Sequence, residues 1–235
     1  MNEDVDVIEV VPGLHLLRLG IANAYLWRDA DGATLVDTGP PGSGPAVDAA
    51  LRSLGLRRED VRRVVLTHFH DDHAGSAAEI ASWAGAQVAA GRADAPFVRG
   101  DAPGPAPVFT AAEQALHAAV AADLEPAPAC RVDQELEDGH VLDVAGGAVV
   151  LGVPGHTPGS VALYLGQHRV LITGDTVAEH QGQMVLGPFN TDRAGAWASL
   201  QRLAAMDVEV ACFGHGEPVT ADAGAALRRA TDVFA

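Results

Sequence analysis

The chain has 235 residues, contains no lysine and has only two cysteines, Cys130 and Cys212. Two cysteines do not suggest a disulfide framework. All fifteen basic residues are arginine, and no basic run could neutralise a phosphate backbone. The formal net charge is −16. Nucleic acids and anionic membrane surfaces are therefore disfavoured as partners, and the charge favours solubility.

Long apolar runs and a targeting pattern are also missing. No stretch reaches the roughly 18 uninterrupted apolar residues that indicate a membrane-spanning helix. The N-terminal Met1-Asn2-Glu3-Asp4 is acidic and lacks the basic and apolar regions of a secretory signal. We therefore expect a cytoplasmic protein. Apolar residues make up 48% of the chain, so a sizeable core can be built.

Patterns typical of strands and helices alternate along the chain. Strands are expected at residues 5–10, 14–19, 24–28, 33–36, 61–66, 86–90, 141–144, 148–153, 161–165, 169–173 and 208–213. Helices are expected at residues 47–54, 75–84, 111–124, 193–206 and 221–233. Thr110 and Glu113 form a capping-box pattern at the third helix. This order predicts one α/β domain over residues 1–235, with two sheets between helices.

Residues 91–110 have little periodicity and hold five Gly or Pro residues between Gly100 and Pro107. Such a long loop is unusual in a compact domain unless it covers a site. We therefore expect residues 91–130, a loop plus a helix, to be an insertion that covers the active site.

The densest group of chemically active side chains is the segment Thr67–Gly75, which follows an apolar run. His68 and His70 are two residues apart, so they point the same way only if the segment is extended. On a helix their directions would differ by roughly 200°. Asp72 and His73 follow where the chain begins to turn, and can reach a second ion nearby. The pattern predicts a metal site.

Three further candidates lie far along the chain. His156, Asp175 and His215 each follow an apolar strand pattern and are flanked by glycine. In layered α/β folds, the loops at strand ends are where sites assemble. Glycine lets the backbone turn sharply enough to direct the side chain inward.

From Asp37-Thr38-Gly39 through His215, these motifs resemble those of the metallo-β-lactamase superfamily, and they occur in the same order. The resemblance implies a four-layer αββα sandwich, in which two mixed β-sheets pack face to face with helices on both outer faces. It implies that His68, His70 and His156 hold one metal ion, that Asp72, His73 and His215 hold a second, and that Asp175 bridges both. Asp37, Thr67 and Thr157 would steady the ligands without binding metal.

The side-chain chemistry agrees with this resemblance. Imidazole and carboxylate ligands suit zinc, although Fe, Mn or Co would also fit. Two metal ions roughly 3.5–4 Å apart can share a water and lower its pKa toward about 7. We therefore expect two Zn²⁺ per chain, a metal-bridging hydroxide as the nucleophile, and Asp72 as a ligand and proton acceptor.

The expected reaction is hydrolysis of a small-molecule ester, lactone, thioester or phosphoester. Asp175 argues against true β-lactamases, which usually lack the bridging Asp. Hydroxyacylglutathione hydrolases carry a helical domain after the last His, and only twenty residues follow His215. Acyl-homoserine lactonases have a Tyr where this chain has Ala178. A mononuclear iron persulfide dioxygenase is the main alternative, and a non-catalytic metal-binding module is a second.

Six residues near the predicted ligands are candidates for the substrate pocket. Most are apolar, which favours an acyl or aromatic substrate over a polyanion. They are Ile21, Tyr25, Phe97, Phe109, Met184 and Phe189. We expect a monomer or a homodimer.

Overall fold

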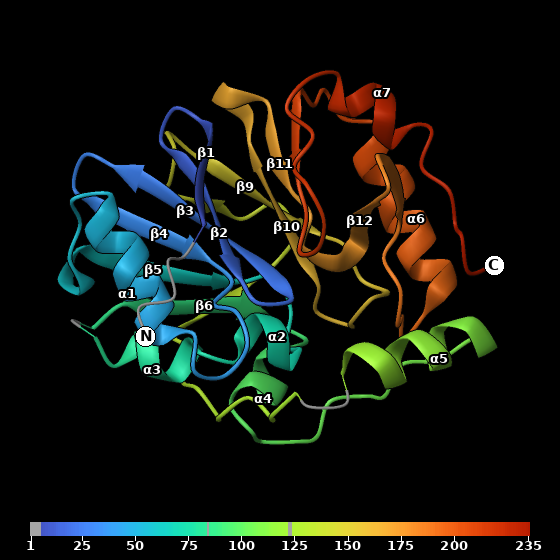
Figure 1. Cartoon of the computed structure of the whole chain (residues 1–235), viewed down its shortest axis with the longest axis horizontal. Coiled ribbons are helices and arrows are strands. Elements are labelled where there is room, and N and C mark those ends of the chain that lie inside the picture. Colours follow the sequence, from blue (N-terminus) through green and yellow to red (C-terminus); the bar gives the residue numbers. More distant parts are fainter. Residues whose placement is uncertain (1–5, 84, 122–123) are drawn as a thin grey trace.

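Two β-sheets lie face to face in the computed structural model, which describes residues 6–83, 85–121 and 124–235 (Figure 1). The first sheet has seven strands in sequence order: β1 (Val7–Val11), β2 (Leu14–Leu19), β3 (Ala22–Asp29), β4 (Gly32–Val36), β5 (Val61–Leu66), β6 (Gln87–Gly91) and β7 (Gln134–Leu136). Strands β1 to β4 pair antiparallel, and β4 to β7 pair parallel.

The second sheet has five strands in a different order: β14 (Val210–Cys212), β11 (Val170–Ile172), β10 (Val161–Leu165), β9 (Ala148–Gly152) and β8 (Val141–Leu142). Only β11 and β14 are parallel. A separate hairpin joins β12 (Val177–His180) to β13 (Gln183–Leu186). The helices are α1 (Gly44–Ser53), α2 (Asp71–Ala74), α3 (Ala77–Ala81), α4 (Ala95–Val98), α5 (Ala111–Val120), α6 (Arg193–Ala204) and α7 (Ala223–Leu227).

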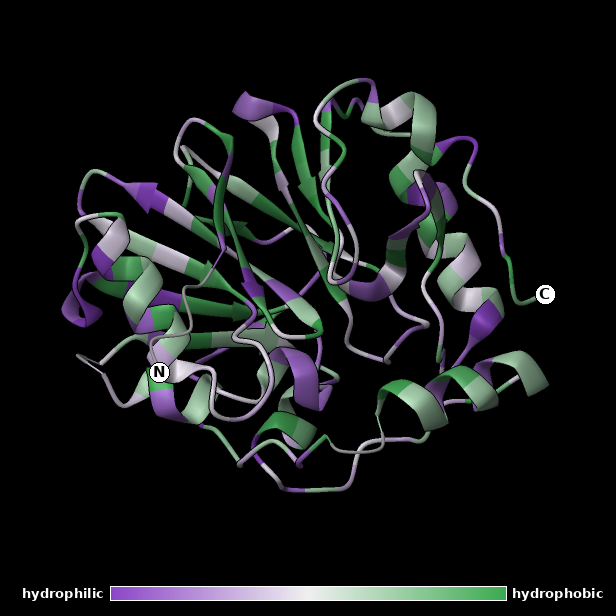
Figure 2. Ribbon diagram, viewed as in Figure 1, coloured by the Kyte–Doolittle hydropathy of each residue, from purple (hydrophilic) through white to green (hydrophobic). Residues whose placement is uncertain are grey.

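Three apolar clusters separate four layers. One packs α1 and α3 against the outer face of the first sheet, the second lies between the sheets, and the third packs α6 and α7 against the second sheet. Val64 and Val65 belong to different clusters because successive side chains of a strand point to opposite faces. The strands carry mostly hydrophobic residues (Figure 2). The predicted αββα sandwich is confirmed.

Most predicted strands are present within a residue or two of their expected ends, and the capping box of Thr110 and Glu113 is confirmed. The helix predicted at 75–84 is present but shorter, since α3 spans only Ala77–Ala81. Helix α2 begins inside the histidine motif, and α3 begins only at Ala77. Pro41 packs against Gly75, and Ser76 donates a hydrogen bond to the Pro40 carbonyl, so tertiary contacts interrupt the helix. Residue 84 lies outside the described part of the chain.

Two other helices are shorter than predicted, and two features were missed. The last helix ends at Leu227 because Leu186 donates a backbone hydrogen bond to Thr231, which draws the chain beside β13. Helix α5 ends at Val120, and residues 122–123 of the predicted helix lie outside the described residues. Strand β7 and the β12–β13 hairpin were not predicted. In the part of the chain that the structure describes, no helix is long and apolar enough to cross a membrane.

Helix α5 is joined to the rest of the molecule mainly through Glu113, which is its one buried residue. The Glu113 carboxylate accepts hydrogen bonds from the backbone N–H of Thr110 (2.8 Å) and of Phe189 (3.1 Å). It also pairs with Arg193 at 2.9 Å, and Arg193 pairs in turn with Asp232. A single carboxylate thus caps α5 and docks it on the segment before α6. Figure 1 shows α5 beside the start of α6.

Replacing Glu113 with alanine should loosen α5. The backbone N–H of Phe189 would lose its acceptor while Arg193 keeps Asp232, so we expect a loss of about 1–3 kcal/mol in unfolding free energy. Amide hydrogen exchange should speed up in α5 before it does in the sheets. Gln114→Ala, an exposed neighbour on the same helix, is the control. Unchanged protection of α5 in Glu113→Ala would contradict this anchoring.

Candidate metal centre

Strand ends from both sheets meet at one place. Strand β4 leads to Asp37, β5 to His68 and His70, β9 to His156, β11 to Asp175, and β14 to His215. Strands β4 and β5 are parallel, as are β11 and β14, so their carboxyl ends share an edge of each sheet. Helix α2 adds Asp72 and His73 from its first turn.

Three imidazole nitrogens converge on one side of the centre. Nδ1 of His70 lies 3.1 Å from Nε2 of His68 and 3.0 Å from Nε2 of His156. Neighbouring ligands of a tetrahedral zinc ion, each about 2.0–2.1 Å from the metal, lie about 3.3 Å apart. The spacing of these three nitrogens is therefore close to that of a tetrahedral ligand set.

A second group of donors lies beside the first. Nε2 of His73 is 3.4 Å from Nε2 of His215. Oδ2 of Asp72 is 3.3 Å from Nε2 of His215 and 3.6 Å from Nε2 of His73. These atoms could also hold one cation together.

Asp175 lies between the two groups. Its Oδ1 is 3.3 Å from Nε2 of His73, and its Oδ2 is 3.2 Å from Nε2 of His215 and 3.7 Å from Nε2 of His156. A Cβ on Gly214 would lie only 1.9 Å from Oδ1 of Asp175. This position must be glycine because the carboxylate occupies that space.

Hydrogen bonds outside the centre fix which nitrogens face it. Nδ1 of His68 lies 3.0 Å from the Thr67 hydroxyl, which itself donates to Asp37 and so accepts from the ring. Nδ1 of His73 lies 3.0 Å from Asp37, and Nδ1 of His215 lies 2.8 Å from the Ile21 carbonyl. In the neutral rings this network assigns each proton to Nδ1, which leaves three Nε2 lone pairs directed at the centre. The donor set therefore fits divalent cations.

Asp37 holds two residues of the centre in place through hydrogen bonds to its carboxylate. It accepts hydrogen bonds from the Thr67 backbone N–H at 2.7 Å, the Thr67 hydroxyl and the His73 ring. Its φ of 61° is left-handed, a conformation that costs a non-glycine residue about 1 kcal/mol or more. The three hydrogen bonds to one carboxylate hold this strained turn in place.

Burial and charge divide the histidines into two kinds. Burial lowers the pKa of His68, His156 and His70, the last to about 3, so these three are neutral and ready to act as ligands. Burial opposes protonation of His73 and His215 too, but Asp175 and the other nearby carboxylates outweigh it. They raise the pKa of His73 well above its ordinary value and the pKa of His215 to about 10.

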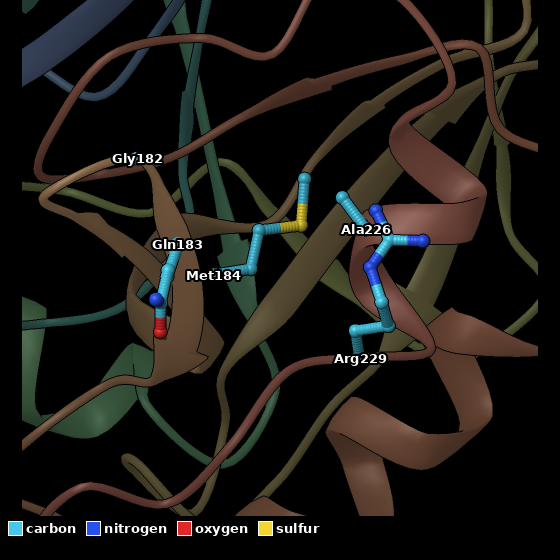
Figure 3. A pocket seen from close by; sticks show the side chains of 5 residues that line it. All are labelled: Gly182, Gln183, Met184, Ala226 and Arg229. Atoms are coloured by element: carbon cyan, nitrogen blue, oxygen red, sulfur yellow. The ribbon is translucent and has the colours of Figure 1, made fainter.

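Two of the residues predicted to line the substrate pocket are buried in the interior. Tyr25 is 2% exposed in the core between the sheets, because its hydroxyl donates to the Phe213 carbonyl and accepts from the Phe213 N–H. Met184 is also buried. It lines a cavity of about 310 Å³ together with Gly182, Gln183, Ala226 and Arg229, none of which is a predicted ligand (Figure 3).

The other four candidates lie closer to the ligands or on nearby segments. Ile21 is 49% exposed beside His215. Phe97 packs against Phe69, whose ring is 4.9 Å from that of His70. Phe109 and Phe189 form an aromatic cluster with His117, with ring centroids 4.8–5.9 Å apart.

One buried carboxylate was missed. Asp94 is fully buried, and burial raises its pKa to about 6 even though it accepts hydrogen bonds from Thr157, Gly159 and Phe69. It lies in the segment expected to be a long loop, which instead contains helix α4. The sequence does offer one signal for Asp94. It comes three residues after an apolar strand pattern that ends in glycine, much as the predicted ligands come shortly after their own strands.

Comparison with known proteins agrees with the fold. The sequence profile described as the Metallo-beta-lactamase superfamily matches residues 17–215. The probable metallo-hydrolase YflN of Bacillus subtilis (strain 168) is 31% identical, over 90% of this chain and 87% of that protein. The hydroxyacylglutathione hydrolase of Fuscovulum blasticum is 31% identical over 82% of this chain, which spans only 61% of that protein.

A solved structure is similar along most of the chain. The metallo-beta-lactamase family protein of Thermus thermophilus superposes with a TM-score of 0.71 at 29% identity, covering 94% of this chain and 78% of that one.

Replacing Gly214 with alanine should weaken metal binding at both groups of ligands. The added Cβ would displace the Asp175 carboxylate, which reaches both, so we expect affinity to fall by about 10- to 100-fold. Competition with a chromophoric chelator measures this. Gly166→Ala, whose Cβ would meet only the Tyr164 ring at 3.4 Å, is the control. Equal affinities in the two variants would refute the argument.

Metal binding near pH 7 should release protons from His73 and His215. Their raised pKa values mean that both rings are protonated without a cation, whereas coordination needs them neutral. We expect about two protons from these rings, and tighter binding as pH rises. Calorimetry in buffers of different ionisation enthalpy counts them. His215→Ala should release about one proton fewer; an unchanged count would contradict the assignment.

Proposed function

Since this chain belongs to the metallo-beta-lactamase superfamily and is a metal-dependent hydrolase, we propose that it holds two Zn²⁺ ions and hydrolyses a small ester, lactone, thioester or phosphoester. The observation that carries the proposal is the position of Asp175. Its carboxylate lies within 4 Å of nitrogens from both groups of ligands. A carboxylate in that position can bridge two cations.

Each group of donors has its own part in the proposal. His68, His70 and His156 hold one cation, and Asp72, His73 and His215 hold the other. With cations held by these residues, the site would supply a water of lowered pKa and a Lewis acid for the oxygen of the scissile group. The protein contributes a largely buried set of ligands, since His68, His73 and His156 are at most 1% exposed.

Asp72 is the proposed proton acceptor. Its Oδ2 lies within 4 Å of Nε2 of both His73 and His215, and its side chain is partly exposed whereas that of His73 is fully buried. Burial raises the pKa of Asp72, but the charges of His73 and His215 outweigh it and bring the pKa to about 2. The carboxylate is therefore ionised at neutral pH, the form that can accept a proton from water and pass it to the leaving group.

Apolar side chains near the centre support an acyl or aromatic substrate. Ile21, Phe97, Phe109 and Phe189 can contact such a group, and the net charge of −16 opposes the approach of polyanions. Ala178 is buried on β12 and supplies no hydroxyl. A lactone would therefore have to be oriented by other groups.

We also propose that residues 91–130 cover the active site. The loop before α5 packs on the histidine motif, since a Cβ on Gly104 would lie 2.2 Å from the Phe69 ring. Farther along, the backbone N–H of Ala127 donates to Asp71 at 2.7 Å. Parts of the segment before and after α5 thus contact the histidine motif.

The test is a panel of lactones, thioesters, carboxylic esters and phosphoesters, combined with metal quantification. We expect two zinc ions per chain and turnover of at least one acyl substrate. His70→Ala should lower kcat/KM by about 100-fold or more, as when a group that stabilises developing charge is removed. His180→Ala, an exposed histidine at the end of β12, should keep full activity.

Two results would overturn the proposal. One is a single iron per chain, with oxygen consumed when glutathione persulfide is added. The other is full activity of His70→Ala on every substrate that the wild type hydrolyses.

A further inference from the structure

The carboxylate of Asp94 is a further acidic group that follows a strand end near the centre. Asp94 follows β6, which is parallel to β5, so its carboxyl end lies on the same edge as the histidine motif. The residue stands at the N-cap of α4, where an aspartate ordinarily accepts a hydrogen bond from the first turn. Here the side chain makes no such bond and turns into the interior instead.

Inside the protein, Asp94 joins two segments that carry ligands. Its Oδ2 accepts hydrogen bonds from the Phe69 backbone N–H at 3.2 Å and from the Thr157 hydroxyl at 2.6 Å. Its Oδ1 accepts from the Gly159 backbone N–H at 2.7 Å. Phe69 lies between His68 and His70, and Thr157 follows His156. One carboxylate therefore contacts both segments of the three-histidine group.

The surrounding backbone is shaped to admit this carboxylate. A Cβ on Gly159 would lie 2.3 Å from the Asp94 nitrogen and 2.7 Å from its Oδ1. A Cβ on Gly91 would lie 1.9 Å from the Gly159 carbonyl oxygen. Two glycines thus allow the chain after β6 to approach the His156 loop closely.

Asp94 and Asp37 divide the support of the centre between them. Asp37 contacts Thr67 and His73, and so acts on the side that includes the second group of ligands. The Asp94 side chain accepts its hydrogen bonds from the segments of His70 and His156 instead. A buried carboxylate is costly unless its oxygens are hydrogen-bonded, and all three bonds here come from those two segments.

We propose that Asp94 is a positioning residue that sets the separation of His70 from His156, and with it the affinity of the three-histidine group for its cation. This inference rests on the proposed function, in which that group binds a metal. The role is distinct from ligation, because Asp94 acts through the backbone at Phe69 and Gly159 and through the Thr157 hydroxyl.

The experiment is a titration of the metal-free full-length protein with Co²⁺ alone, followed by absorption. His156→Ala and His215→Ala identify which binding step belongs to which group of ligands. Asp94→Asn puts an amide NH₂ group in place of one carboxylate oxygen, so that it faces one of the three hydrogen-bond donors. We expect it to weaken the step lost in His156→Ala by about 10- to 100-fold and to leave the other step nearly unchanged.

Two further variants keep the test decisive. Thr157→Val removes one of the three donors without changing the carboxylate, and should cause a smaller loss in the same step. Asp133→Asn is the control, because the Asp133 carboxylate accepts a backbone hydrogen bond from Val88 N–H of β6 (2.8 Å) rather than from the ligand segments. It should leave both steps unchanged. If Asp94→Asn does not fold, Thr157→Val carries the test alone.

The outcomes separate the two proposals. Normal Co²⁺ binding by Asp94→Asn and Thr157→Val, or an equal loss in both steps, would refute the positioning role while leaving the proposed function standing. Absence of any Co²⁺ binding by the wild type would refute both.

Discussion

The close approach of imidazole nitrogens and carboxylate oxygens at one point is the constraint on which the rest of the structure depends. Nε2 of His68 and Nδ1 of His70 face each other at 3.1 Å, and the Thr67 hydroxyl accepts a hydrogen bond from Nδ1–H of His68 at the far side of the ring. Buried polar atoms without partners cost free energy, and a cation satisfies several lone pairs at once. The sharp turns, glycines and buried acids around the centre all serve to hold these atoms together.

Neither sheet alone contains the centre. The first sheet and α2 supply His68, His70, Asp72 and His73, whereas the second sheet supplies His156, Asp175 and His215. The relative position of the two sheets is fixed by the apolar cluster between them and by buried polar contacts. One such contact is the Asn23 amide, which donates to the Phe213 carbonyl at 3.1 Å. The packing of the sheets therefore sets the distance between the two groups of ligands, and a loosened core would separate them.

Features set by local pattern could be predicted from the sequence, and features set by distant contacts could not. The apolar run before His68 and the i, i+2 spacing of His68 and His70 are local, so the extended segment and its donors are predictable. The interruption at Gly75 depends on Pro41, and the early end of α7 depends on pairing with β13. Tyr25 resembles a pocket residue because its strand lies near the site, but its alternation on β3 directs it into the core. Asp94 gives little signal because only the folded chain brings it against Phe69 and Thr157.

The two sides of the centre differ in how firmly they are built. The ligand side is buried and held by carboxylates, with Asp37 and Asp94 each accepting three hydrogen bonds. By contrast, α5 buries only Glu113, and Phe109 beside it is 36% exposed. We expect a substitution on the exposed side of α5 to leave the ligands in place, because they are held by Asp37, Thr67 and Asp94. Under the proposed function, activation of water would depend on the buried ligands and the carboxylates that hold them, including Asp94, whereas the choice of substrate would depend on the exposed side near α5.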